Sequence, residues 1–314
     1  MTVAAQPDRT AWPATLRPAL AGECVLLPGR AGGVACYVGG PPEGAPLLLV
    51  HSLNAAASAF EIKPVFDWAV AQGWRVYAPD LPGYGRSPRG PRDYCIRLFT
   101  DAVHDVLDHA ASERAGVPVD VLGLSLGSEF VARAAVETPA RVRTLALVTP
   151  TGFMRGNGKR TGPELSSLEV PGLHAVFNNG LWGQGVFDLL VSRRSVRYFM
   201  RRTFGTQHGG NEPPEALIDY AYETAHQPQA RHAPYAFVSA RLFSRDIRRV
   251  YERITQPVWV PHATRGDFRD FSDADWARAR AHWTFTPLAT GAMPFWEEPA
   301  RFCALYAEFL QRAA

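Results

Sequence analysis

The chain has 314 residues, of which 46% are hydrophobic and 20% are charged, and its formal net charge is +3. This length and composition predict a globular protein with one large core, or a core with a smaller domain attached. The small net charge argues against a nucleic-acid partner, because binding to a phosphate backbone needs a dense basic surface. No stretch is long and apolar enough to span a bilayer, so we expect no membrane partner.

The N-terminal 20 residues contain prolines and charged residues but no apolar run, which predicts neither a secretion signal nor an anchor. The four cysteines lie far apart and show no metal-ligand spacing, which suits a reducing compartment better than a disulfide framework. Together these features predict a cytoplasmic protein. We expect no cofactor, because the sequence has no clustered metal ligands, no phosphate-binding glycine-rich loop and no dinucleotide fingerprint.

Apolar runs alternate with helical patterns through the first 150 residues. The predicted strands lie at 24–27, 34–38, 47–50, 75–78, 119–122 and 144–148. The predicted helices lie at 57–72, 92–111 and 128–137. Strand 47–50 is continuously apolar, which is typical of a strand covered on both faces. The alternation predicts a doubly wound, mostly parallel sheet of the α/β class.

The pattern changes between residues 151 and 251, where strand-like runs give way to helical segments rich in Trp, Phe and Tyr. The alternation then resumes with a predicted strand, helix, strand and helix at 258–260, 273–281, 284–288 and 299–311. We therefore predict a core formed by residues 1–150 and 252–314. A helical insert at 151–251 interrupts that core.

The segment GLSLG at 123–127 lies between a predicted strand and a predicted helix. A G-x-S-x-G match alone is a weak signal, but the strand-turn-helix context is what a nucleophile elbow requires. Such a turn exposes the oxygen of Ser125 beside a helix N-terminus, where the N–H of Leu126 faces a developing oxyanion. We therefore predict that Ser125 is a nucleophile. A turn that only happens to hold a serine is the alternative interpretation.

Several ordered motifs resemble the α/β-hydrolase family, and the resemblance covers nearly the whole chain. The run LLLVHS at 47–52 is similar to the strand and His-Gly loop that precede the family's first helix. The run DLPGYGRS at 80–87 is similar to the D-x-P-G-x-G-x-S loop, and PVWV at 257–260 to the strand that delivers the triad acid. The insert at 151–251 stands where the family places its lid.

The resemblance implies a second oxyanion donor just after the His-Gly loop, the N–H of Leu53, with Asn54 as a side-chain candidate. In this chain Ser52 replaces the glycine, and a backbone angle that glycine adopts freely would then be closed. The resemblance also implies a triad acid after the strand that follows the insert. Asp267 is the best-placed candidate and Asp270 the alternative. Pairing with a neighbouring arginine is the structural interpretation of either carboxylate.

The resemblance implies a histidine base after the last strand, but the matching stretch GAMPFWEEP at 291–299 has Ala292 in its place. No histidine follows His282, which precedes the final strand and is expected at the wrong end of it. His262 is expected to be structural. Among the histidines of the insert, His226 is a candidate displaced base, although a lone histidine there is more often a surface or capping residue.

Three functions are compatible with these residues. The first is a serine hydrolase that acts on an ester or other acyl small molecule, and the aromatic insert favours an apolar substrate. The second is a non-hydrolytic lyase, isomerase or cyclase, which uses an oxyanion hole without a triad. The third is a catalytically silent binding protein on the same fold. We take the first as our hypothesis; the sequence specifies neither the exact substrate nor the oligomeric state.

Overall fold

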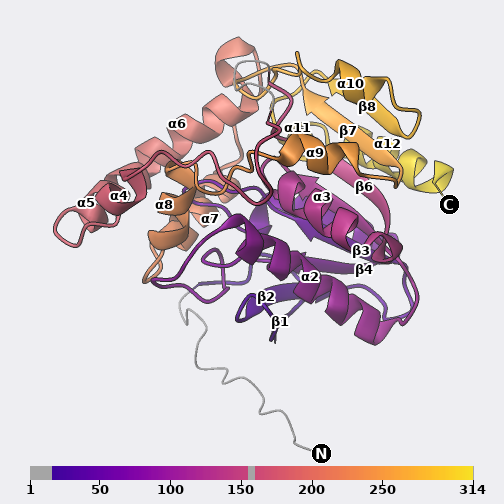
Figure 1. The fold of residues 1–314 in the computed structure, drawn as a ribbon, viewed down its shortest axis with the longest axis horizontal. Helices are drawn as coiled ribbons and strands as arrows, with labels where there is room; N and C mark the ends of the chain where they lie inside the picture. Colours follow the sequence, from indigo (N-terminus) through magenta and orange to yellow (C-terminus); the bar gives the residue numbers. More distant parts are fainter. Residues whose placement is uncertain (1–15, 155–159, 314) are drawn as a thin grey trace, which may run out of the picture.

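The computed structural model describes residues 16–154 and 160–313 and contains an eight-stranded sheet (Figure 1). The strands are β1 (Glu23–Leu27), β2 (Val34–Gly39), β3 (Pro46–Val50), β4 (Arg75–Pro79), β5 (Val119–Leu124), β6 (Val142–Val148), β7 (Val258–Ala263) and β8 (Trp283–Leu288). Their order across the sheet is β1-β2-β4-β3-β5-β6-β7-β8. The pairs β1/β2 and β2/β4 are antiparallel and all the others are parallel. The predicted fold class is therefore confirmed.

Helices cover both faces of the sheet. Figure 1 shows α2 (Ile96–Glu113) and α3 (Gly127–Glu137) side by side in front of the strands. The opposite face is covered by α1 (Lys63–Ala71) and the C-terminal α12 (Pro299–Arg312). The sheet is therefore doubly wound, and its strands need apolar side chains on both faces.

Strand β3 illustrates why a continuous apolar run forms a central strand. Leu48 and Val50 pack into the buried cluster that includes α2 and α3, whereas Leu47 and Leu49 pack into the cluster that includes α1 and α12. All four side chains are fully buried. Successive side chains of a strand point to opposite faces, so this run can fill two cores at once. The loop that follows β3 leaves the sheet at the edge where the site lies.

Between β6 and β7 the described chain forms short helices and connecting loops. These helices are α4 (Leu173–Phe177), α5 (Gly183–Leu190), α6 (Arg193–Phe204), α7 (Glu215–Ala225), α8 (His232–Val238) and α9 (Ile247–Glu252). Figure 1 shows α4, α5 and α6 extending to the upper left of the sheet. Two short helices, α10 (Asp275–Arg278) and α11 (Pro294–Glu297), follow β7 and β8. The short 3-10 helices are η2 (Ala59–Ile62), η3 (Pro139–Arg141) and η5 (Thr206–His208).

Some element boundaries differ from those that the sequence predicts. Helix α2 begins at Ile96 rather than 92, because Cys95 before it is extended, with φ −135° and ψ 167°. The helix predicted at 273–281 is reduced to the single turn of α10, and the N–H of Asp273, which precedes this turn, donates to the carbonyl of Phe153. Strand β7 runs three residues beyond 260, because it stays paired with β8 as far as Ala263.

The sequence predicts neither a secretion signal nor an anchor in the first 20 residues, and 1–15 of these lie outside the described residues. Residues 155–159 of the predicted insert also lie outside them. Of the helices that the structure describes, none combines the length and apolar character needed to cross a lipid bilayer.

Candidate active site

Ser125 lies in a tight turn between β5 and α3. Its φ of 53° is in the left-handed region, which residues other than glycine rarely adopt. Its N–H donates to the carbonyl of Val148 at 2.9 Å, and the hydroxyl of Ser128 donates to the carbonyl of Gly123 at 2.8 Å. Hydrogen bonds on both sides thus stabilise a strained strand-to-helix turn, the geometry that a nucleophile elbow requires.

The two glycines of the turn allow close packing around Ser125. A Cβ on Gly127 would lie 2.3 Å from the carbonyl oxygen of His51, and a Cβ on Gly123 would lie 2.7 Å from Cγ2 of Val131. Neither contact is sterically acceptable. The absence of these side chains lets the loop after β3 lie directly against the start of α3.

A cavity of about 630 Å³ lies at this edge of the sheet, and Ser125 forms part of its wall. The wall also includes the loop after β3, the loops after β7 and β8, and the helices between β6 and β7. Those helices and loops contribute mainly apolar side chains, among them Leu190, Val196, Phe199, Met200, Phe237 and Phe243. A cavity of this size with apolar walls suits an apolar small molecule.

Leu53 and Leu126 both line this cavity and are buried. Neither backbone N–H donates to an acceptor within the described residues. A buried N–H without a partner is uncommon in folded proteins. The two groups are therefore available to an oxygen atom of a ligand bound next to Ser125.

Asn54 also lines the cavity, but its amide group is already engaged. Its Nδ2 donates to Glu61 Oε1 at 2.7 Å and to Ser52 Oγ at 3.1 Å, and its Oδ1 accepts from the N–H of Ala56 at 2.7 Å. An amide has two donor hydrogens, so both are used. The structure thus does not support Asn54 as a side-chain oxyanion donor and gives it a role in shaping the loop.

The serine that replaces the family's glycine causes no strain. Ser52 is not among the described residues with a positive φ, and its N–H donates to Glu61 Oε2 at 2.9 Å. The preceding His51 accepts the N–H of Leu81 at Nε2 (2.9 Å), so its proton lies on Nδ1, which donates to the carbonyl of Ser52 at 2.5 Å. Burial lowers the pKa of His51 to about 4. His51 is therefore a neutral structural residue.

The two candidate acids lie in different surroundings. Asp267 lines the cavity, and its Oδ2 accepts from Nε of Arg202 on α6 at 2.5 Å. Nη1 of Arg202 also donates to the hydroxyl of Tyr198 at 2.9 Å. Asp270, which is exposed like Asp267, does not line the cavity and accepts the N–H of Ser272 at 2.9 Å. Of the two, the structure brings only Asp267 to the cavity that Ser125 lines.

Ala292 is buried, lines the cavity, and donates its N–H to the carbonyl of Thr203 at 2.8 Å. His226 is not brought into the cavity. It is exposed just after α7, its Nδ1 donates to the carbonyl of Tyr222 at 2.8 Å, and its ring lies 3.9 Å from the Tyr222 ring. This local contact holds the imidazole on the surface, and the prediction of a displaced base at His226 is not supported by its position.

No histidine is among the cavity-lining residues in the described part of the chain. His262 belongs to β7, where its ring packs 4.3 Å from that of Phe271 and burial lowers its pKa. His282 precedes β8, at the opposite end of that strand, and forms a hydrogen bond with the carbonyl of Ile254 at 3.0 Å. No group of three His, Cys, Asp or Glu residues in the described ranges is arranged to hold a metal ion.

Two charged residues at the site are not singled out by the sequence patterns. Glu61 is 2% exposed, and burial raises its pKa to about 7. Glu61 follows Ala59 and Phe60, so the feature of the sequence that could have indicated it is a lone carboxylate within an apolar run. Arg202 belongs to an arginine-rich helix of the insert, and nothing local distinguishes it as the partner of Asp267.

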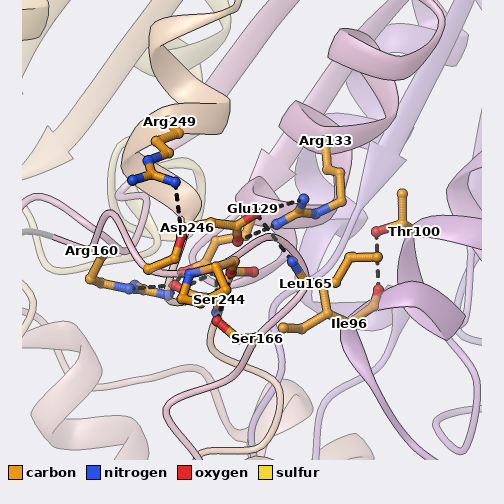
Figure 2. A network of polar contacts seen from close by, with 12 residues as sticks. Ile96, Thr100, Glu129, Arg133, Arg160, Leu165, Ser166, Ser244, Asp246 and Arg249 are labelled. Atoms are coloured by element: carbon orange, nitrogen blue, oxygen red, sulfur yellow. Dashed lines mark hydrogen bonds and ion pairs between the residues drawn. The ribbon is translucent and has the colours of Figure 1, made fainter.

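A buried network joins α3 to both ends of the chain between β6 and β7 (Figure 2). Glu129 accepts from Nη2 of Arg160 at 2.7 Å and from the N–H of Ser244 at 2.9 Å. One turn further along α3, Arg133 donates to Asp246 at 2.7 Å and 3.1 Å. The helix that begins at the elbow thus also holds the chain that forms the cavity wall.

The chain matches the model of the alpha/beta hydrolase family over residues 47–305. It therefore belongs to the α/β-hydrolase family.

Curated relatives and solved structures of this family include several hydrolases. The 2-hydroxymuconate semialdehyde hydrolase of Pseudomonas sp. (strain CF600) is 32% identical over 35% of this chain and 38% of its own length. The pimeloyl-[acyl-carrier protein] methyl ester esterase of Nitrosomonas europaea is 24% identical over 76% of this chain and 86% of its own. The crystal structure of 2-hydroxy-6-oxo-6-phenylhexa-2,4-dienoate hydrolase from Rhodococcus sp. strain RHA1 has a TM-score of 0.68 at 18% identity, over 92% of this chain and 99% of that one.

The chain matches only 38%, 44% and 31% of the length of three of the first curated relatives. The structural similarity shows the shared fold, and the relatives support hydrolase chemistry in general terms.

Proposed function

We propose that this protein is a serine hydrolase acting on an ester or other acyl small molecule with an apolar acyl group, and that Ser125 is its nucleophile. One observation carries the proposal. The strained serine shares a mostly apolar cavity with the N–H groups of Leu53 and Leu126, which have no acceptor within the described residues. An acyl-transfer site needs this combination, because a preorganised pair of donors stabilises the negative charge that develops on the carbonyl oxygen.

In the proposed reaction Oγ of Ser125 attacks the carbonyl carbon, and the carbonyl oxygen becomes negative between the two N–H groups. The leaving group departs as the carbonyl re-forms, and water then releases the acyl group from Ser125. Asp267 is the proposed acid of the site. Because Ala292 stands in the position of the base, the serine proton passes to solvent, and we expect slow turnover with reactive esters.

We further propose that residues 151–251 act as a lid on a core formed by residues 1–150 and 252–314. Support comes from the apolar side chains that this insert contributes to the cavity, such as Phe199, Met200 and Phe237. A lid that supplies apolar contacts would select the acyl group. The four cysteines are free thiols, which is consistent with the reducing, cytoplasmic location that we propose.

Labelling with an alkyl fluorophosphonate tests the proposal. We expect slow modification confined to Ser125, located by mass spectrometry and abolished in Ser125→Ala. Ser112→Ala is the matched control, because Ser112 is exposed on α2, donates to the carbonyl of His109 and lies outside the cavity. A folded protein that remains unlabelled after prolonged exposure would refute Ser125 as a nucleophile.

One observation favours a second function on the same fold. The cavity lacks a histidine among the described residues, and Asp267 is engaged by Arg202. A lyase, isomerase or cyclase can use the N–H pair to stabilise an enolate without a covalent bond to Ser125, and a binding protein needs only the apolar walls. An unreactive alkyl ketone separates the cases: binding by a protein that the fluorophosphonate does not label would favour this second function.

A further inference from the structure

A buried glutamate lies directly behind the loop that follows β3, residues 51–56, which we call the oxyanion loop. The carboxylate of Glu61 accepts two hydrogen bonds from this loop: the main-chain N–H of Ser52 at 2.9 Å and the side-chain amide of Asn54 at 2.7 Å. One carboxylate thus binds the residues on both sides of Leu53.

We infer that Glu61 is a positioning residue that keeps the Leu53 N–H facing the cavity, and that the ionisation of Glu61 controls this geometry. The inference rests on the proposed function, since the direction of this N–H affects catalysis only if an acyl compound binds at Ser125.

The chemistry of a carboxyl group explains the control. An ionised carboxylate accepts on both oxygens, so it can hold the Ser52 N–H and the Asn54 amide together. When the group is protonated, one oxygen carries a hydrogen and no longer accepts in the same way. One of the two contacts is then weakened, and Leu53, which lies between the two contacts, loses its fixed orientation.

The main chain of Glu61 is fixed independently of its carboxyl group. Its carbonyl accepts from Nε1 of Trp296 at 2.6 Å. The adjacent Phe60 ring stacks on Tyr220 of α7 at 4.6 Å and lies 5.9 Å from the Trp296 ring. Helix η2 is therefore held by α7 and α11 whatever the charge of Glu61. A change in protonation acts on the loop and leaves the support in place.

The surroundings of Glu61 place its titration in the neutral range. Burial is the largest influence and raises its pKa to about 7, whereas the hydrogen bonds from Ser52 and Asn54 oppose this. Among the groups that face this region, His51 is neutral above about pH 4. The pKa of Tyr84 lies well above 10, because burial disfavours its anion. Within the described residues, no charged side chain contributes to the raised pKa of Glu61.

Amide NMR of the full-length ¹⁵N-labelled protein tests the inference without requiring activity. We expect the Leu53 amide resonance to titrate between pH 5.5 and 8.5 with a midpoint near 7, and this transition to disappear in Glu61→Gln. Glu215→Gln is the control, because Glu215 is an exposed glutamate paired with Arg197 on the surface. A Leu53 resonance that is constant with pH in the wild type would overturn the inference, even if Glu61→Gln failed to fold.

The fluorophosphonate reaction gives the functional readout. Loss of one oxyanion donor lowers rates about 10² to 10³-fold in characterised hydrolases. We therefore expect the ratio of wild-type to Glu61→Gln labelling rates to rise at least about tenfold from pH 5.5 to 8.5. A flat ratio with a constant Leu53 amide would overturn the role of Glu61 and leave the nucleophile intact. If the Leu53 amide resonance titrates but the protein is never labelled, the proposed function is refuted, whereas the positioning role of Glu61 is retained.

Discussion

Replacing Ala292 by histidine tests whether the lack of a histidine at this position limits the proposed reaction of Ser125. Ala292 is buried and lines the same cavity as Ser125 and Asp267. Its N–H donates to the carbonyl of Thr203 at 2.8 Å, so its main chain is held in place by the end of α6. An imidazole attached at position 292 therefore starts from a fixed point on the wall that the serine also lines.

The expected size of the effect follows from what surrounds Asp267. General-base catalysis contributes about 10² to 10⁴ in rate, or about 3 to 5 kcal/mol of barrier. We expect Ala292→His to reach only the lower end, because Arg202, whose Nε donates to Oδ2 of Asp267 at 2.5 Å, competes with the new histidine for this carboxylate. Arg202→Met keeps an apolar stem of similar length and releases Asp267. The double variant should therefore approach the upper end.

The assay is the second-order rate of fluorophosphonate labelling, with hydrolysis of a p-nitrophenyl ester as a second readout. Val238→His is the matched control. Val238 lines the cavity from α8, so this substitution adds an imidazole to the cavity at a place other than the loop after β8. Equal rates for the parent, Ala292→His and Val238→His, in proteins with unchanged thermal unfolding, would refute the reasoning.

Two further predictions concern stability. The pKa of Glu61 is 4.5 for a free side chain and about 7 in the fold, so ionisation costs the native state about 3 kcal/mol above pH 7 and nothing below pH 4.5. In urea unfolding, the free energy of unfolding of Glu61→Gln should therefore rise relative to that of the parent as pH rises from 5 to 8. A difference that does not change with pH would contradict this. Arg133→Met leaves Asp246 buried without its cation and should lose about 3 to 5 kcal/mol, most of which Asp246→Leu should restore; additive losses in the double variant would argue against the pairing.

The sequence predicts the sheet and the elbow well because both depend on local patterns. The run Leu47 to Val50 is apolar on every residue, and only a strand buried on both faces needs that. The elbow combines a strand, two glycines and a helix within a few residues. The structure places a tight turn with a positive φ at Ser125 between the strand and the helix that the sequence predicts.

The polar partners of the site could not be predicted in the same way, because they are distant in sequence. Glu61 and Trp296 are 235 residues apart, and Arg202 and Asp267 are 65 apart. Whether a carboxylate is buried beside such a partner depends on how helices pack, which no local period encodes. For the same reason the surface position of His226 emerges only from the fold, as its contact with Tyr222 occupies the imidazole locally.

The arrangement of α3 bears on how the proposed acyl site could function with Ala292 at the position where the family resemblance implies a histidine. The helix begins at the elbow, and in its first turn the carboxylate of Glu129 accepts from the hydroxyl of Thr151, which lines the cavity. Helix α3 therefore connects the turn that holds Ser125 to another residue of the cavity wall. The proposed oxyanion donors are main-chain groups, which the substitution of a side chain does not remove. In serine hydrolases that lose a triad member, such donors and binding alone retain about 10³ to 10⁴-fold catalysis over water. The geometry that stabilises charge and the group that moves the proton are thus separable, and the proposed function of this chain requires only the first.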